Sequence, residues 1–415
     1  MTGREPGWLD AQGRHTALVV DAASVVGLAQ ELVRIRSVHQ PDSGSGEAEA
    51  AALVMTTMRG FGWEPEVVEV SPGRPNVIAT VPGGGGHGPV LAFEGHLDVV
   101  TEGDRGDWTV GPYDGEIRDG RLYGRGAADM KAGVAAMIHA ARALQLAGPF
   151  PGAIRLLALA DEEGMMLGAK HAVASGALAD VAGVIVCEPE GGEVCPTSKG
   201  AIRIRIDLSG KMAHGAMPHQ GSNPIPVLAE LVQALGRLQD RLQAEGGEHP
   251  HLGWTYVTPT VALAGRLEQL NVSPATATLA VDVRTVPGTD HRRLIEEVAD
   301  ACHRLGVKAG VRCELTVLDD RPAVDTPVDD PVVASLVAAH TEVTGTPPMY
   351  GGVPGTTDGT IFTRDAGVAT VVYGPGGKWI AHQADEFVEV DEIPRYARVY
   401  ARAAQIFLQR DQGPA

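Results

Sequence analysis

Five short clusters of histidine and acidic residues are the places along this chain where chemistry could occur. They are Gly95-His96-Leu97-Asp98, Gly126-Ala127-Ala128-Asp129-Met130-Lys131, Asp161-Glu162-Glu163-Gly164, Cys187-Glu188-Pro189 and Ala381-His382-Gln383-Ala384-Asp385-Glu386. Two imidazoles combined with carboxylates suit zinc, cobalt or manganese, and two such ions a few ångströms apart can activate a water molecule. The clusters therefore indicate a ligand set for two metal ions in a hydrolase.

The first cluster pairs a histidine with an aspartate. His96 and Asp98 lie two residues apart at the end of an apolar stretch, so their side chains can share one side of a strand. Asp98 could then accept a proton from the far ring nitrogen of His96 and fix its tautomer. The alternative is a solvated surface pair, which the His-x-Asp spacing taken alone would favour.

The third cluster carries two adjacent carboxylates. Glu162 and Glu163 follow the apolar stretch 154–160, which would direct them towards the edge of a sheet. One carboxylate could bind metal while its neighbour takes a proton from the activated water, because a general base must reach that water from outside the coordination shell. The alternative is a polar loop without chemistry.

Four further residues are ambiguous when taken singly. Asp129 precedes a helix, where a lone aspartate is usually an N-cap, but the other clusters favour a ligand that bridges two ions. Glu188 follows another apolar run, and His382 follows Gly374-Pro-Gly-Gly377, a loop that permits close backbone approach. His214 is remote in sequence and alone would be dismissed as a loop histidine.

Alternating helices and strands would position the clusters. Apolar periodicity predicts helices over 21–36 (with Asp21 as cap), 47–59 and 131–147, and strands over 66–70, 76–81, 90–95 and 154–160. Two of these strands end at the first and third clusters. This order is typical of an α/β sheet whose ligands gather at strand ends.

The pattern changes between about 199 and 321. The order there is β-α-β-β-α-β, with strands at 201–208, 256–264, 275–283 and 311–318 and helices at 223–245 and 290–305, the second ending at Gly306. Helix 330–344, strand 368–373 and helix 391–409 return to the first pattern. The predicted fold class is α/β: a catalytic domain with a mixed central sheet flanked by helices (1–198 and 322–415), interrupted by an inserted α+β ferredoxin-like lid domain (199–321).

The composition favours a folded soluble protein and argues against some partners. The 415 residues are 44% hydrophobic and 21% charged, and this length suits two domains. Aromatic residues make up only 4%, so the cores must be built from Ala, Val, Leu and Ile. The net charge of −18 argues against nucleic acid and membrane as partners, since both need a positive surface.

The compartment is predicted from cysteines and from the N-terminus. The four cysteines show no Cys-x-x-Cys spacing, which indicates free thiols in a reducing environment. Residues 1–10 contain no apolar targeting region, and no window approaches the length of a membrane span. The sequence therefore predicts a cytoplasmic protein.

These motifs together resemble the co-catalytic zinc aminoacylase and carboxypeptidase family, which includes acetylornithine deacetylase, succinyl-diaminopimelate desuccinylase, aminoacylase and glutamate carboxypeptidase. The resemblance spans about residues 21–409 and is strongest from Gly95-His-Leu-Asp-Val-Val100 through Trp108 to Asp119-Gly-Arg-Leu-Tyr-Gly-Arg-Gly-Ala-Ala-Asp-Met-Lys131.

The resemblance implies roles for the clustered residues. One ion would be held by His96, Asp129 and Glu188, and the other by Asp129, Glu163 and His382, with Asp129 bridging. The ions would be zinc, with cobalt or manganese as alternatives. Glu162 would be the general base and later the acid that protonates the leaving amine, and the Asp129–Met130 peptide bond would be cis.

The resemblance also implies a substrate-binding lid and a homodimer formed through it. His214 matches a lid histidine that reaches the neighbouring subunit's site and stabilises the oxyanion. Asn271 and Arg284 match positions that bind the substrate α-carboxylate, although Arg284 could instead form a salt bridge to a nearby acid. The loops that contain Gly355, Thr356 and Gly376 would line the pocket.

The implied activity is metal-dependent cleavage of the amide bond of an N-acyl amino acid. A metallo-carboxypeptidase or dipeptidase acting on short peptides is the alternative, and a non-catalytic metal-binding homologue is a third possibility, against which Glu162 argues. N-carbamoyl amidohydrolases fit less well because of Trp108 and Gly124-Arg-Gly126. Two stretches that depart from the family, Gly221-Ser-Asn-Pro-Ile-Pro226 and Gly265-Arg-Leu-Glu-Gln269, affect the substrate pocket. The acyl group, the amino acid, the physiological metal and the pathway stay open.

Overall fold

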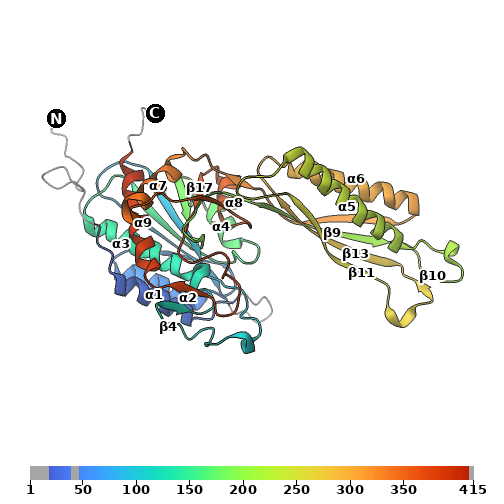
Figure 1. The fold of residues 1–415 in the computed structure, drawn as a ribbon, viewed down its shortest axis with the longest axis horizontal. Coiled ribbons are helices and arrows are strands. Elements are labelled where there is room, and N and C mark those ends of the chain that lie inside the picture. Colours follow the sequence, from blue (N-terminus) through green and yellow to red (C-terminus); the bar gives the residue numbers. More distant parts are fainter. Residues whose placement is uncertain (1–17, 39–45, 411–415) are drawn as a thin grey trace. The chain divides into compact units, whose positions relative to one another are not determined.

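The computed structural model describes residues 18–38 and 46–410. The chain forms two compact units (Figure 1): the first runs to Pro196, includes Thr326–Gly352 and resumes at Thr357, and the second comprises Thr197–Asp325 and Val353–Thr356. The three predicted domain segments stay a prediction. The predicted absence of a targeting region in residues 1–10 falls outside the described residues.

A large mixed sheet forms the centre of the first unit. Its strands run in the order β1-β2-β6-β3-β7-β17-β8, with β16 beside β8. Strands β6, β3, β7 and β17 are mutually parallel, while β1, β2 and β8 pair antiparallel with their neighbours. The strands are β1 (Glu66–Ser71), β2 (Arg74–Pro82), β3 (Val90–His96), β6 (Ala153–Leu159), β7 (Val181–Val186), β8 (Val194–Ser198), β16 (Tyr350–Val353) and β17 (Thr370–Val372).

Helices cover this sheet and share its core. They are α1 (Ala22–Arg34), α2 (Ala48–Gly60), α3 (Ala132–Ala147), α4 (Leu167–Ala174), α7 (Pro331–Thr344), the short α8 (Gly359–Ile361) and α9 (Glu392–Gln409). The carboxylate of Asp21 accepts hydrogen bonds from the first turn of α1, as predicted for a cap. The core is rich in alanine and valine, and most of α3 is buried, so small side chains let helices α3 and α9 approach closely.

A small antiparallel sheet joins two distant parts of the first unit. Its strands are β4 (Glu116–Arg118), β5 (Arg121–Tyr123) and β18 (Phe387–Glu389), in the order β18-β5-β4. The backbone N–H of Gly124 donates to the carbonyl of Glu386 at 2.9 Å just beyond the paired strands. This pairing places the segment that follows His382 beside the segment that precedes Asp129.

The second unit is a four-stranded antiparallel sheet covered by two helices. Its main elements are β9 (Gly200–Ser209), α5 (Pro224–Gly246), β11 (Tyr256–Ala264), β13 (Thr276–Thr285), α6 (His291–Ala309) and β14 (Arg312–Arg321), with short β10 (Ala213–His214), β12 (Val272–Ser273) and β15 (Val324–Asp325). The strand order β11-β13-β9-β14 and the β-α-β-β-α-β sequence are those of a ferredoxin-like fold. Ile202, Ile204 and Ile206 alternate into its core. The predicted fold class is confirmed.

One helix end differs from the prediction. Helix α6 continues past Gly306 and ends with Gly310 in the left-handed conformation. A Cβ at Gly306 would lie 2.5 Å from the carbonyl oxygen of Val311, so this glycine lets the next strand approach the helix instead of ending it. Single turns occur at η1 (Arg105–Asp107), η2 (Ala127–Lys131), η3 (Pro218–Gln220), η4 (Leu267–Gln269) and η5 (Phe362–Ala366).

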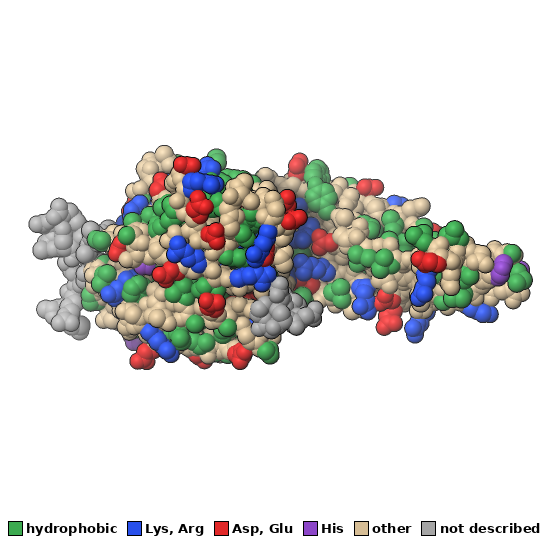
Figure 2. Space-filling view, turned by 90° about the horizontal axis from the view of Figure 1, so that it is seen from below, with side chains coloured by type: hydrophobic (Ala, Val, Ile, Leu, Met, Phe, Trp, Pro, Cys, Tyr) green, Lys and Arg blue, Asp and Glu red, His purple; other side chains and the backbone are tan. Residues whose placement is uncertain are grey.

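The surface mixes charges of both signs. Figure 2 shows acidic and basic side chains interspersed over the face that it draws. Among residues 18–38 and 46–410, no helix combines the length and the apolar character needed to cross a membrane. All four cysteines are free thiols, and Cys187, Cys195 and Cys302 are buried.

Candidate dinuclear metal centre

The carboxyl ends of three parallel strands carry site residues of the first unit. Strand β3 ends at His96, β6 leads into Glu162 and Glu163, and β7 leads into Glu188. Because β6, β3 and β7 are adjacent and parallel, their carboxyl ends lie at the same edge of the sheet.

Asp129 reaches the same edge from the turn η2 that precedes α3. Gly126 starts this turn in the left-handed conformation, and the Asp129–Met130 peptide bond is cis, as the resemblance implied. The carboxylate of Glu386 accepts hydrogen bonds from the backbone N–H groups of Ala128 and Asp129, each at 3.0 Å, and Arg125 pairs with Glu386 at 2.5 Å. Buried side chains therefore fix the backbone of Asp129.

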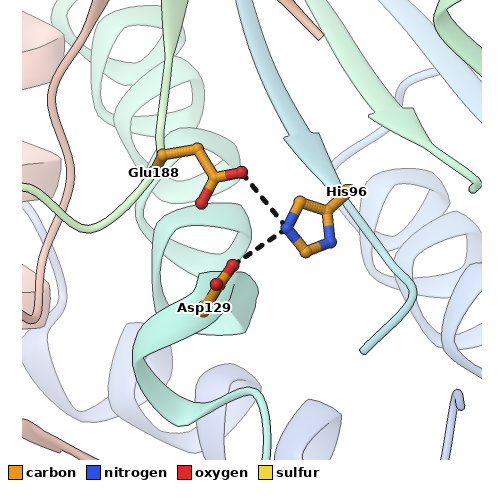
Figure 3. A group of neighbouring side chains, drawn as sticks. All are labelled: His96, Asp129 and Glu188. Carbon is orange, nitrogen blue, oxygen red and sulfur yellow. Dashed lines mark hydrogen bonds and ion pairs between the residues drawn. The ribbon is translucent and has the colours of Figure 1, made fainter. Parts of the chain in front are cut away.

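The first candidate ligand group contains His96, Asp129 and Glu188 (Figure 3). The Nε2 atom of His96 lies 3.0 Å from Asp129 Oδ1 and 3.2 Å from Glu188 Oε1. As Figure 3 shows, both carboxylates face the same imidazole nitrogen, one from the turn before α3 and one from the end of β7.

The second group contains Asp129, Glu163 and His382. The Nε2 atom of His382 lies 3.2 Å from Asp129 Oδ2 and 2.8 Å from Glu163 Oε1. His382 is half exposed and has a left-handed backbone conformation with φ of 65°. Asp129 thus presents a different oxygen to each imidazole, and within each group the donor atoms lie within 4.8 Å of one another.

Asp98 lies behind this pair of groups and differs in detail from the prediction. The Nδ1 atom of His96 lies 2.9 Å from the backbone carbonyl of Asp98, while the Asp98 carboxylate is 3.6 Å away. That carboxylate accepts hydrogen bonds from the backbone N–H groups of Glu162 and Glu163, each at 3.1 Å. Asp98 therefore orients His96 mainly through its backbone and the two glutamates through its side chain.

Converging carboxylates raise the pKa values of the groups that surround Asp129. Burial alone would lower the pKa of His96, but Glu188 and Asp129 raise it well above its usual value. Hydrogen bonds from His382 to Asp129 and Glu163 raise the pKa of His382 to about 10. Burial and the charge of Asp129 raise the pKa of Glu188 to about 8. Protons on these groups compensate for converging carboxylates, and divalent cations would do the same with the same donor atoms.

Glu162 stands beside the groups without belonging to either. Its side chain is 8% exposed. Burial raises the pKa of Glu162 well above its usual value, opposed by His96 and supported by Glu188 and Glu163. A carboxyl group with a raised pKa close to a metal centre is suited to exchanging protons with a water molecule there.

A buried network under the two glutamates was not predicted from the sequence. The guanidinium of Arg74 pairs with Glu47 at 2.5 Å and with Asp161, and lies 3.7 Å from the Asp98 carboxylate. The backbone N–H of Asp161 donates to Glu47 at 3.1 Å. The sequence signal was weak, because an arginine after a turn and a glutamate before a helix are usually solvated.

Three predicted residues, His214, Asn271 and Arg284, lie in the Thr197–Asp325 part of the second unit, where the first two are neighbours. His214 in β10 pairs with Val272 in β12, and Gly215 N–H donates to the Asn271 carbonyl at 2.7 Å. Arg284 donates from Nε to Asp282 at 2.8 Å, so it makes the salt bridge that the sequence left open as an alternative.

The predicted loop residues divide between the units. Gly355 and Thr356 belong to the second unit, where Arg321 donates to the Thr356 hydroxyl at 3.3 Å. Gly376 belongs to the first unit, and a Cβ there would lie 2.8 Å from the Ala128 side chain. Its left-handed φ of 89° and lack of a side chain let the loop pack against the segment that carries Asp129.

Comparison with known proteins places this chain in a family. A family model described as peptidase family M20/M25/M40 matches residues 92–406. A probable succinyl-diaminopimelate desuccinylase of Staphylococcus epidermidis is 29% identical, with 94% of this chain and 100% of the relative covered. The succinyl-diaminopimelate desuccinylase of Methylorubrum extorquens is 33% identical, with 92% and 99% covered.

A solved structure shows the same fold at lower identity. The YXEP protein of Bacillus subtilis, described as a dinuclear metal-binding peptidase, has a TM-score of 0.72 and 18% identity, with 94% of this chain and 98% of that chain covered. Taken with the sequence relatives, the fold and the paired ligand groups define a metal-dependent hydrolase acting on linear amide or peptide bonds. The chain belongs to peptidase family M20/M25/M40.

Proposed function

We propose that this protein hydrolyses the amide bond of an N-acyl amino acid at a centre of two zinc ions. One ion would be held by His96, Asp129 and Glu188, and the other by Asp129, Glu163 and His382. The observation that carries the proposal is the orientation of Asp129, whose two carboxylate oxygens face two different imidazoles at 3.0 and 3.2 Å.

The protein's own contribution to the reaction centres on Glu162. Two bound divalent ions would supply a water of lowered pKa and polarise the scissile carbonyl. Glu162 would take the proton from that water and later deliver it to the leaving amine. The hydrogen bonds from the backbone N–H groups of Glu162 and Glu163 to Asp98 hold these adjacent carboxylates in distinct positions, one in a ligand group and one beside it.

The substrate class is proposed from the relatives. Succinyl-diaminopimelate desuccinylases match nearly the full chain, which supports an N-acyl amino acid with a succinyl-like or acetyl group. A carboxypeptidase or dipeptidase activity is the second candidate, because the family description and the Bacillus subtilis structure both name peptidases. A non-catalytic homologue would not need the buried carboxyl of Glu162.

The second unit would complete the site in a homodimer. His214 would stabilise the oxyanion in the partner's site, and Asn271 and Arg284 would bind the substrate α-carboxylate, together with the loops of Gly355, Thr356 and Gly376. His214 ends β10 and Asn271 directly precedes β12, the strand paired with β10, and this adjacent placement supports a shared role. We also propose a cytoplasmic location, because free thiols are typical of reducing compartments.

Replacement of Glu162 tests the mechanism. Glu162→Gln should lower turnover by roughly 100- to 10,000-fold because proton transfer is lost, while both ions stay bound. Metal content measured by mass spectrometry should therefore match that of the wild type, while turnover falls. The control is Glu389→Gln, which breaks an exposed ion pair with Arg121 and should keep full activity. Normal turnover in Glu162→Gln would refute the assigned role.

A substrate panel separates the two activities. Purified protein should be assayed with N-acetyl amino acids, N-succinyl amino acids and dipeptides, each with and without a chelator. Cleavage of the acyl compounds that the chelator abolishes supports the first candidate. Cleavage confined to dipeptides would replace it with the second, and no cleavage of any amide in the metal-loaded protein would favour the non-catalytic reading.

A further inference from the structure

An ion-pair cluster of Lys378, Glu190 and Glu193 lies in the first unit, within the loops that carry Glu188 and His382. The ammonium of Lys378 is 2.9 Å from Glu190 Oε2, 2.8 Å from Glu193 Oε2 and 3.3 Å from the carbonyl oxygen of Gly352. The Glu190 side chain is 3% exposed, and the Cys195 thiol donates to it at 3.3 Å. One lysine therefore compensates two carboxylates, one of them fully buried.

The cluster connects the two loops that carry terminal ligands. Glu190 and Glu193 follow Glu188 in the loop between β7 and β8, and Lys378 precedes His382 in the loop between β17 and β18. Glu188 of the first ligand group and His382 of the second thus lie within a few residues of this ion pair in the sequence.

Backbone contacts bring the same two loops together. Gly191 N–H donates to the Gly376 carbonyl at 2.9 Å, and Glu190 N–H donates to the Gly374 carbonyl at 3.4 Å. The Trp379 ring packs on Gly191, where a Cβ would lie 2.6 Å from it. These contacts hold the loops near each other before His382, and the ammonium of Lys378 ties their side chains.

A third metal ion is the other reading of this cluster. The donor atoms of Glu190, Glu193 and Cys195 lie within 4.8 Å of one another, a spacing that could hold an ion. The Lys378 ammonium, however, already contacts both carboxylates at hydrogen-bond distance. The cluster is therefore satisfied by a cation that belongs to the chain.

We propose that Lys378 is a positioning residue that ties the Glu188 loop to the His382 loop and so sets His382 for binding its ion. The inference rests on the proposed function in taking Glu188 and His382 as ligands. Glu188 directly follows a central strand, whereas His382 is half exposed on a long loop. Loss of this ion pair should therefore lower the affinity of the His382 site for its ion more than the affinity of the His96 site.

Metal titration of the full-length protein tests the proposal without relying on activity. Metal-free wild type should bind two Zn²⁺ ions in calorimetry. Lys378→Met should keep one site unchanged and weaken the other by at least about tenfold. Lys378→Arg keeps the cation and should restore affinity to within about threefold of wild type. The matched control is Arg402→Gln, which removes the 2.6 Å salt bridge from Arg402 in α9 to Glu342 in α7. This variant should bind both ions normally.

A triple variant separates the charge of Lys378 from its positioning role. If Lys378 only neutralised Glu190 and Glu193, Lys378→Met combined with Glu190→Gln and Glu193→Gln would regain full affinity, and the positioning role would be overturned. Continued weakness of one site supports it. Binding of a third Zn²⁺ by Lys378→Met, with both original sites unchanged, would also overturn it, because the lysine would then act only by excluding a cation.

The ligand assignment needs its own comparison. His382→Ala and Glu188→Ala should each remove one ion from an otherwise folded protein. If neither does, the proposed function fails at its ligand assignment. If both do and Lys378→Met still binds two ions with wild-type affinity, only the role of Lys378 fails.

Discussion

Asp129 is the residue on which both candidate ligand groups depend, since it offers Oδ1 to one imidazole and Oδ2 to the other. Asp129→Asn keeps the shape of the side chain and removes its charge. We expect loss of both ions at micromolar metal concentrations, measured by metal analysis after dialysis. Glu188→Gln belongs to one group only and should lose a single ion. Retention of two ions by Asp129→Asn would contradict a bridging role.

The protonation of His382 predicts opposite pH dependences with and without metal. Its pKa is raised from 6.5 to about 10 by Asp129 and Glu163 in the metal-free protein. Because this pKa is higher in the folded protein than in the unfolded chain, protonated His382 stabilises the fold fully below pH 6.5. That stabilisation is lost as the pH rises towards 10. Bound metal requires the neutral imidazole, so metal should stabilise more as pH rises.

Thermal unfolding from pH 6 to 10 checks this expectation. The Tm of the metal-free protein should fall across that range, and the gain in Tm on adding Zn²⁺ should grow. Metal-free His382→Gln should show a smaller fall, since it lacks the titrating group. A metal-free wild type whose Tm is flat from pH 6.5 to 10 would contradict the raised pKa.

Individual site residues were predictable where the local sequence carries the signal. His96, Glu162, Glu163 and Glu188 follow apolar runs, and an apolar run before a carboxylate or imidazole implies a strand end. The contribution of Glu386 was not predictable, because it comes from hydrogen bonds to Ala128 and Asp129, far away in the sequence. Pairing at long sequence separation leaves no local pattern.

At the scale of elements, Arg74 joins β2 to the segment before α2 and to the turn after β6. Arg74→Met should destabilise the protein by about 3–5 kcal/mol, because it leaves buried Glu47 and Asp161 without their cation. Urea unfolding monitored by circular dichroism measures this loss. Arg118→Gln removes an exposed arginine and should change stability by less than about 1 kcal/mol.

The long helices and strands could be predicted from apolar periodicity, but the shortest strands could not. Helices α1, α3, α5 and α9 appear within a few residues of their predicted ranges, since each has a clear apolar stripe or cap. The sheet β18-β5-β4 was missed, because strands of three residues are too short to show alternation. The predicted end of α6 was wrong, because Gly306 allows close packing against Val311 and does not end the helix.

At the scale of the whole molecule, the proposed homodimer predicts complementation between inactive variants. Glu162→Gln and His214→Ala should each be nearly inactive. If His214 serves the partner's site, mixing equal amounts after subunit exchange should restore about a quarter of wild-type activity, because half of the dimers are mixed and each mixed dimer has one intact site. No recovery, despite mixed dimers detected by native mass spectrometry, would contradict a shared site.

The chain leaves the first unit and re-enters it at neighbouring points, since Thr326 N–H donates to the Pro196 carbonyl at 2.9 Å. Because these two points are close together, the first unit can fold around an inserted domain without rearranging its own strands. Replacing residues 197–325 with a tight turn should therefore leave a folded first unit that still binds two zinc ions but no longer binds substrate. Other domains could be inserted at the same junction, so substrate selectivity could be changed separately from the metal centre.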